Sequence, residues 1–135
     1  PSASERIMVG GITPDELGKV LVTALKNNDL KVWYGCILNV DMSKAKETLE
    51  FIRKQLVMDG LTNWSLLKFK RVTYSEVHHN GKVKAGEYRF FHVEFAYGTE
   101  YLGRIECNLI QLHKGKYVVL NPFYGGGIKR KEDYH

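Results

Sequence analysis

Apolar residues recur at intervals of three or four through the first sixty positions of the chain, which is the spacing of one face of an α-helix. Three stretches follow this pattern and predict three successive helices. Their apolar faces are formed by Leu17, Val20, Leu21, Ala24 and Leu25, by Leu30, Trp33 and Ile37, and by Ala45, Leu49, Ile52 and Leu56.

The starts of these helices carry local signals of their own. Thr13 is placed to cap the first helix, Pro14 suits the first helical position, and the Glu16 carboxylate can reach back toward the cap. Either Asp41 or Ser43 can cap the third helix. The helix starts are therefore expected near these residues.

Beyond residue 60 the pattern changes to the alternation of a half-buried strand, in which successive side chains face opposite ways. Phe91, Val93 and Phe95 alternate with polar residues, and we expect them to face the helices. Asn80-Gly81 lies between two such runs and predicts a tight hairpin turn. Four strands are predicted, at about 64–77, 83–97, 101–112 and 117–120.

Strands joined by tight turns are antiparallel neighbours, and helices segregated from strands along the chain define the α+β class. The sequence therefore predicts three N-terminal helices packed on a curled four-stranded antiparallel sheet with the shape of a cone. We expect a flexible N-terminal arm at 1–12, a single domain at 13–124, and a C-terminal tail at 125–135 that begins with three glycines.

Composition narrows the class of protein. Apolar residues make up 44% of the 135 and charged residues 26%, which is ordinary for a globular domain. No apolar run approaches the ~20 residues that span a bilayer. We expect a soluble protein, either cytoplasmic or exported with its signal removed. Cys36 and Cys107 are expected to be buried thiols, with a disulfide as the alternative in an exported protein.

The net charge of +5 raises the question of an anionic partner. The cations are spread along the chain, and no nucleic-acid-binding motif accompanies them. Binding to nucleic acid or another anionic partner is therefore a third interpretation. Its candidate contacts are Lys68, Lys70, Arg71, Lys82 and Lys84.

Three local features resemble the nuclear transport factor 2-like superfamily. They are the Thr-Pro-Asp-Glu opening at 13–16 with its helix and the polar break at 27–29, the long hairpin around Asn80-Gly81, and the Leu-His-Lys-Gly-Lys-Tyr-Val-Val run at 112–119. The resemblance covers about 13–124. Small bacterial proteins are common in this superfamily, which also includes ketosteroid isomerase, scytalone dehydratase and polyketide cyclases. It implies a pocket between the helices and the concave face of the sheet.

In enzymes of that superfamily the pocket holds an acid–base pair, and four residues here are candidates for such a role: Tyr34, Asp41, His92 and Tyr97. Each has a simpler interpretation, because Tyr34 suits the edge of a core and Asp41 a helix cap. His92 and Glu94 share a strand face and suit cross-strand pairs with Arg104 and Glu106 on the next strand. The candidate ligand contacts are Trp33, Tyr34, Phe91, Phe95 and Tyr97.

No cofactor motif is present, and three histidines in two turns, at 78, 79 and 113, make a poorly preorganised metal site, so we expect neither cofactor nor metal. Aromatic residues crowd the second strand and the turn after it, on both faces, which favours a homodimer through the outer sheet face. The preferred interpretation is a non-enzymatic binding domain, with a small apolar ligand in the pocket. The alternative is a cofactor-independent isomerase, dehydratase or cyclase.

Overall fold

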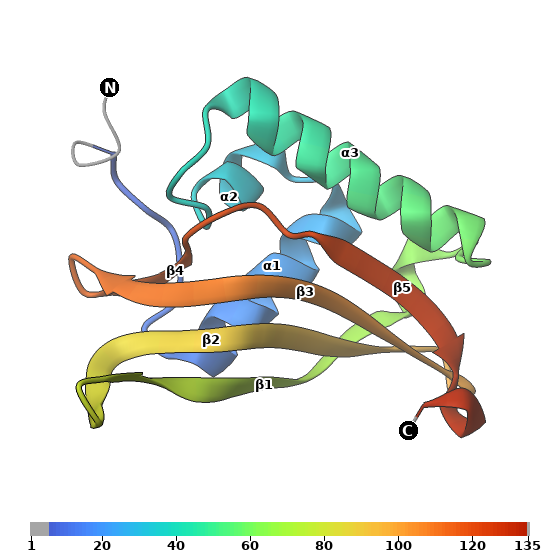
Figure 1. The fold of residues 1–135 in the computed structure, drawn as a ribbon. Coiled ribbons are helices and arrows are strands. Elements are labelled where there is room, and N and C mark those ends of the chain that lie inside the picture. The colour runs from blue at the N-terminus through green and yellow to red at the C-terminus, as the bar shows by residue number, and fades with distance from the viewer. Residues whose placement is uncertain (1–5, 135) are drawn as a thin grey trace.

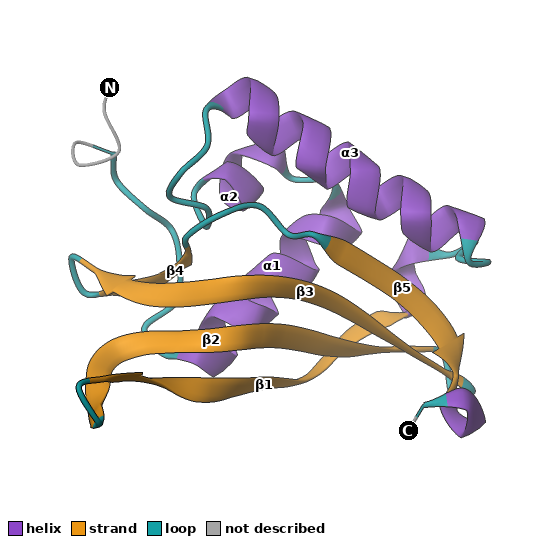
Figure 2. Ribbon diagram, in the orientation of Figure 1, coloured by secondary structure: helices purple, strands orange, loops and turns teal. Residues whose placement is uncertain are grey.

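The computed structural model describes residues 6–134 and has helices first and strands after. The helices pack on one side of the sheet, and its opposite, outer face is turned toward the viewer in Figures 1 and 2. The elements are α1 (Pro14–Asn27), α2 (Leu30–Tyr34), α3 (Met42–Met58), η2 (Trp64–Leu66), β1 (Leu67–His79), β2 (Lys82–Tyr97), β3 (Tyr101–His113), β4 (Lys116–Val119), β5 (Gly125–Arg130) and η3 (Lys131–Asp133).

The capping signals in the sequence are confirmed. Thr13 Oγ1 accepts a hydrogen bond from the backbone N–H of Glu16 at 3.1 Å, and the Glu16 carboxylate accepts one from the N–H of Ile12 at 3.0 Å. Of the two candidate caps for α3, Asp41 is the one that caps, accepting from the N–H of Lys44 at 2.8 Å. The helices therefore begin where short-range hydrogen bonds satisfy their first free N–H groups.

The sheet has five antiparallel strands, so the prediction of four was wrong. The strand order is β1-β2-β3-β4, and β5 also pairs with β3. Pairing with β4 uses residues 110–113 of β3, and pairing with β5 uses residues 101–106. Two short strands thus share one edge of the long strand β3.

The missed strand is β5, which lies in the stretch that we assigned to a tail. Gly125, Gly126 and Gly127 lack the side chains that mark a strand in sequence, because Gly is intrinsically unfavourable there. Tertiary contacts stabilise the strand instead. Ile128 is buried at 7% exposure, and its N–H donates to Asp59 Oδ2 at 3.0 Å. His135, the last residue of the tail, lies outside the described residues.

The sheet is also not strongly curled, contrary to the expected cone. The register shifts that bend a sheet occur in the pairing of β1 with β2, at the sheet edge. By contrast, β2 and β3 keep a constant register from the Glu87–Gln111 pair to the Tyr97–Tyr101 pair. Bending is therefore local, and the centre of the sheet stays regular.

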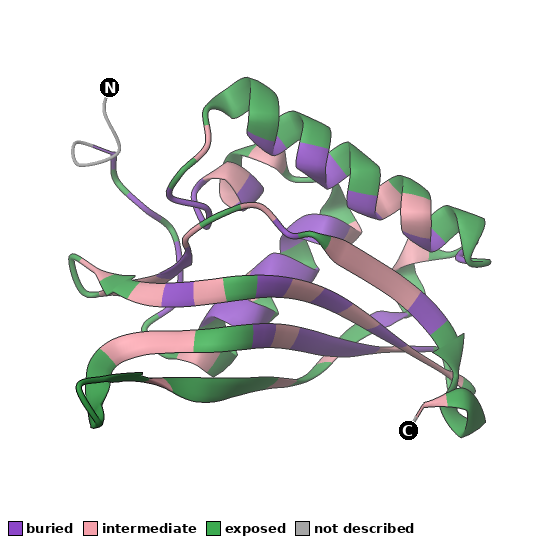
Figure 3. Ribbon diagram, in the orientation of Figure 1, coloured by how far each residue is buried: buried purple, intermediate pink, exposed green. Residues whose placement is uncertain are grey.

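The core lies between the helices and the half of the sheet nearest β5, where the buried segments gather in Figure 3. Phe91, Val93 and Phe95 are at 0% exposure and face the helices, as predicted. Gly18 of α1 lets this helix approach β1, because a Cβ at that position would collide with Val72 and Phe69. None of the helices in the described chain is long and apolar enough to cross a membrane.

Within the predicted N-terminal arm, residues 1–5 lie outside the described residues. Those that follow are hydrogen-bonded to the body of the fold. Val9 donates its N–H to the carbonyl of Gly35 at 2.8 Å, and Gly11 and Tyr117 exchange two backbone hydrogen bonds at 3.1 and 2.7 Å. The segment 9–11 thus bridges α2 and β4.

Phe90, inside β2, is in the left-handed region with φ of +56°, which is rare for an aromatic residue. Its side chain is 53% exposed, so little burial would be lost on removing it. We expect Phe90→Gly to raise the free energy of unfolding by about 1 kcal/mol, because Gly adopts this φ without strain. Chemical denaturation measures the change. Val83→Gly, at an exposed β2 position without positive φ, should lower the free energy of unfolding. If both variants were less stable than the wild type, the argument from backbone strain would be contradicted.

Candidate functional site

A core of buried side chains packs between the helices and the sheet. Trp33, Phe91 and Phe95, which we expected to contact a ligand there, are at 0% exposure in the hydrophobic core. The Trp33 ring lies 5.3 Å from that of Phe123, and its indole N–H donates to Thr48 Oγ1 at 3.1 Å. No hollow described below is lined by the three residues, and their contact with a ligand stays a prediction.

The candidate catalytic residues of the helical part have structural partners. Tyr34 lies under the guanidinium of Arg6, whose central carbon is 3.7 Å from the centre of the ring. Asp41 caps α3, as its simpler interpretation had it. Tyr34 thus packs against the N-terminal segment, and Asp41 stabilises the start of a helix. A catalytic role for either residue stays a prediction.

The two candidates on β2 lie on opposite faces of the sheet. His92 is half-buried on the outer face, across from Thr73 of β1 and Glu106 of β3. Tyr97 points toward the helices, and its hydroxyl accepts hydrogen bonds from the N–H groups of Thr62 and Asn63 at 2.9 and 3.1 Å. The bonds from Thr62 and Asn63 lower the pKa of Tyr97. Among the described residues, no hydrogen bond joins any two of the four candidates.

Charged residues line the outer face of the sheet, where the sequence predicted cross-strand pairs. Glu94 is buried at 7% exposure between Arg71 and Arg104, which contact its two carboxylate oxygens. Arg104 also lies 3.5 Å from Glu106. The cross-strand pair of Glu94 with Arg104 is therefore confirmed, whereas Arg104 and Glu106 lie on the same strand. Phe90 is an exposed aromatic in this strand, and the homodimer through the sheet face stays a prediction.

Two of the five basic candidates for an anionic partner are already paired. Arg71 is bound to Glu94, and Lys84 Nζ lies 2.6 Å from Glu87 Oε2. Lys68, Lys70 and Lys82 complete this set. The set therefore presents less free charge than the sequence suggests.

The two cysteines are free and buried, as the simpler interpretation had it. Burial raises the pKa of Cys36 to about 12, and it raises that of Cys107 as well. Both thiols are therefore protonated at neutral pH and poor nucleophiles. No cluster of three or more potential metal ligands occurs within residues 6–134.

The largest hollow described is an open groove of about 720 Å³ where β2 bends. There β2 pairs with β1 at Tyr88–Glu76, and the next pair toward the turn is Val83–His78. Four residues of β2, 84–87, therefore lie opposite a single residue of β1, Val77. Gly86 has φ of +80°, which makes the bend possible without strain. The tip of the β1–β2 hairpin consequently diverges from β3 and opens the groove.

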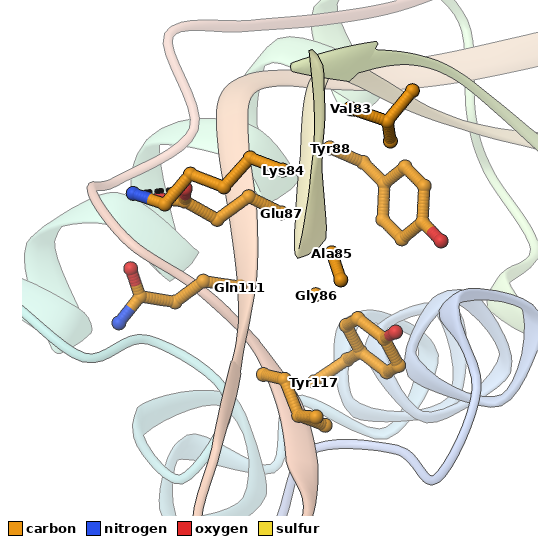
Figure 4. Close-up of a pocket in the computed structure, with 9 residues that line it drawn as sticks. Val83, Lys84, Ala85, Gly86, Glu87, Tyr88, Gln111 and Tyr117 are labelled. Carbon is orange, nitrogen blue, oxygen red and sulfur yellow. Dashed lines mark ion pairs between the residues drawn. The ribbon is translucent and has the colours of Figure 1, made fainter. Parts of the chain in front are cut away.

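We name this hollow the tyrosine groove, since Tyr88 and Tyr117 line it. Figure 4 shows the two rings and Val83 on one side of β2, with Lys84, Glu87 and Gln111 on the other. The ring centres of Tyr88 and Tyr117 are 6.0 Å apart, and Tyr74 extends the row, 4.6 Å from Tyr88. Ala85, Gly86 and Leu112 complete the lining. One side is therefore largely apolar and the other polar.

The tyrosines of this row influence each other electrostatically. Burial raises the pKa of Tyr117, and the neighbouring Tyr88, through its charge and a side-chain hydrogen bond, raises it further. Burial and the same neighbour raise the pKa of Tyr74. Tyr74 and Tyr117 are thus uncharged at neutral pH, and the row offers ring faces and hydroxyls to a ligand.

Sequence reasoning missed this groove, although one signal pointed to it. A glycine inside a strand pattern indicates a bulge or a close backbone approach, and Gly86 interrupts the second predicted strand. Tyr88 is one of the aromatic residues that crowd the second predicted strand. Tyr117 of β4 pairs with Leu112 of β3, and Tyr88 pairs with Ile110 of the same strand, 22 residues further along the chain. The approach of the two rings depends on both pairings together and has no local signature.

No family model, curated protein or solved structure matches this chain. The α+β architecture, with helices before an antiparallel sheet, stands on the structure itself. The resemblance to the nuclear transport factor 2-like superfamily stays a prediction.

Proposed function

We propose that the protein is a non-catalytic binding domain whose site is the tyrosine groove. Its ligand would be a small, largely apolar molecule that carries a ring. The observation that carries this proposal is the groove itself, the largest hollow described, with two tyrosine rings along one wall. The filled interior between helices and sheet moves the expected ligand from there to the open end of the sheet.

The size and chemistry of the groove support such a ligand. Its volume of about 720 Å³ lies within the ~300–1,000 Å³ of typical small-molecule sites. A ring can stack on Tyr88 or Tyr117, where offset or edge-on contacts are favourable. The Gln111 amide and the Lys84–Glu87 pair can bind a polar substituent of the same ligand. These groups are few and specific, as in sites that recognise mostly apolar molecules.

The test is a titration with indole, a small neutral ring compound, followed by ¹H–¹⁵N NMR. We expect saturable shifts confined to residues of the groove, with a dissociation constant on the order of 1 mM. Leu112→Asn should weaken binding several-fold, because Leu112 lines the groove and is 48% exposed.

The matched control is Leu66→Asn, because Leu66 is 43% exposed and lies in η2, outside the groove lining. It should leave the affinity for indole unchanged. Equal weakening in both variants would contradict the proposal, as would shifts centred on the core residues around Trp33. Indole without saturable shifts at the groove would likewise reject this site.

The relation to the nuclear transport factor 2-like superfamily belongs to the same proposal. The three leading helices and the hairpin around Asn80-Gly81 support it, since both turn residues have the positive φ that a tight hairpin requires, +52° and +76°. The modest curl and the fifth strand depart from the expected cone. The enzymatic alternative lacks support from the four candidate residues, since they are dispersed over the fold.

A further inference from the structure

A second hollow, of about 260 Å³, lies between the N-terminal segment and the turn that joins β3 to β4. Its lining differs from that of the tyrosine groove, because four of its six residues are basic. They are Arg6, His113, Lys114 and Lys116, with Ile7 and Met8 as the apolar part. Among the described residues, no carboxylate lines this hollow.

Arg6 contributes a buried positive charge beside it. The residue is 9% exposed, and its guanidinium donates to the backbone carbonyls of Ile37 and Leu38 at 3.0 and 3.1 Å, and to that of Tyr34. These partners are dipoles and a ring face, not charges. Within the described part of the chain, the Arg6 charge has no carboxylate partner, and a buried charge is costly without one.

His113, which lines the same hollow, carries an unsatisfied polar atom. Its Nε2 is buried and has no hydrogen-bond partner in the described structure. Buried polar atoms in proteins are almost always paired, so this nitrogen indicates a missing partner. Lys116, which pairs with His113 across the hairpin, also lines this hollow and brings an ammonium group to it.

We propose that this hollow binds the phosphate group of a small phosphorylated molecule. The phosphate oxygens would accept from the Lys116 ammonium and from the His113 imidazole after a small rotation of the ring, and the dianion would offset the charge of Arg6. The site is separate from the tyrosine groove, so it does not depend on the function proposed there. Phosphate is favoured over a carboxylate because several cations converge and phosphate carries the larger charge.

The test uses inorganic phosphate and glycerol 3-phosphate as probes in an NMR titration at low ionic strength, with acetate as the control anion. We expect saturable shifts of His113 and Lys116 with both phosphates, with a dissociation constant on the order of 1 mM, and weaker binding of acetate. Lys116→Gln should weaken phosphate binding by about five-fold or more. Lys54→Gln removes an exposed lysine of α3 and should leave binding unchanged.

If Lys116→Gln and Lys54→Gln weakened phosphate binding equally, the binding would depend on net charge and not on this hollow. That result would overturn the proposal. Acetate binding as tightly as phosphate, or phosphate shifts that do not saturate, would overturn it too. Vesicles of phosphatidylcholine with phosphatidic acid distinguish the source of the group. Sedimentation of the protein with these vesicles, reduced by Lys116→Gln, would place the phosphate on a lipid, and its absence alongside binding of glycerol 3-phosphate would place it on a soluble molecule.

Discussion

Gly103→Ala is expected to lower the free energy of unfolding by about 3 kcal/mol, measured by chemical denaturation. Gly103 of β3 is directly opposite Phe95 of β2, and the Phe95 ring lies across it. A Cβ at this position would be 2.8 Å from Phe95 Cδ2 and closer still to two other ring atoms. The ring has no room to move, because it is fully buried in the core.

Gly125→Ala is the matched control, since Gly125 also lies in a strand and pairs with Glu106 of β3. No atom lies within 4 Å of a Cβ built there, and its φ is not positive. We expect a change of no more than about 0.5 kcal/mol. A smaller side chain opposite position 103, as in Phe95→Leu, should relieve much of the cost of Gly103→Ala in a double-mutant cycle. Equal costs for the two glycine variants would contradict the packing of Phe95 over Gly103.

Glu94→Gln is expected to lower the free energy of unfolding by about 2 kcal/mol at pH 7. The Glu94 side chain is 9% exposed and is held by Arg71 and Arg104. Burial by itself would raise the pKa of Glu94, but the hydrogen bond and charge of Arg71, together with Arg104, outweigh it and the pKa is lowered. The neutral amide cannot balance the two guanidinium groups.

This substitution should also change the dependence of stability on pH. Because the pKa of Glu94 is lowered by folding, its stabilising contribution is present above the ordinary carboxyl pKa of 4.5 and is lost as the pH falls through the lower, folded value. The wild-type and Glu94→Gln proteins should therefore converge in stability in acid. Denaturation series at several pH values measure this convergence.

Glu106→Gln is the control for this effect, because Glu106 contacts the same Arg104 at 3.5 Å but its side chain is 31% exposed. More exposed ion pairs contribute less to stability, so we expect Glu106→Gln to lower the free energy of unfolding by less than about 1 kcal/mol. A difference between wild type and Glu94→Gln that stays constant from pH 7 into acid would show that charge is not the cause. A decrease in the free energy of unfolding in Glu106→Gln equal to that in Glu94→Gln would show the same.

Neighbouring residues alone determined much of the helical half and the hairpin turn. The cap by Thr13, the cap by Asp41 and the turn at Asn80-Gly81 each depend on groups within four residues of one another. Such interactions do not need the rest of the fold, so their residue types are readable in one sequence. The alternation of Phe91 and Phe95 with polar residues also placed them correctly on the helix side.

Tertiary structure decided the features that depend on distant partners. The three glycines of β5 form a strand because β3 offers a free edge and Asp59, 69 residues earlier, accepts from Ile128. The tyrosine groove exists because β1 and β2 lose their register between Glu76 and His78, while β4 carries Tyr117 toward Tyr88. The second hollow joins Arg6 to residues more than a hundred positions away.

These cases share one physical reason. Caps and turns are stabilised by hydrogen bonds that close within a few residues, so their energy belongs to the local sequence. Strand pairing, register and the burial of a side chain gain their energy from segments that meet only in the folded chain, and the same residues would behave otherwise with other partners. The amino-acid sequence by itself thus determined the helices, the hairpin and the α+β class, while long-range pairing decided the fifth strand, the filled interior and the position of both hollows.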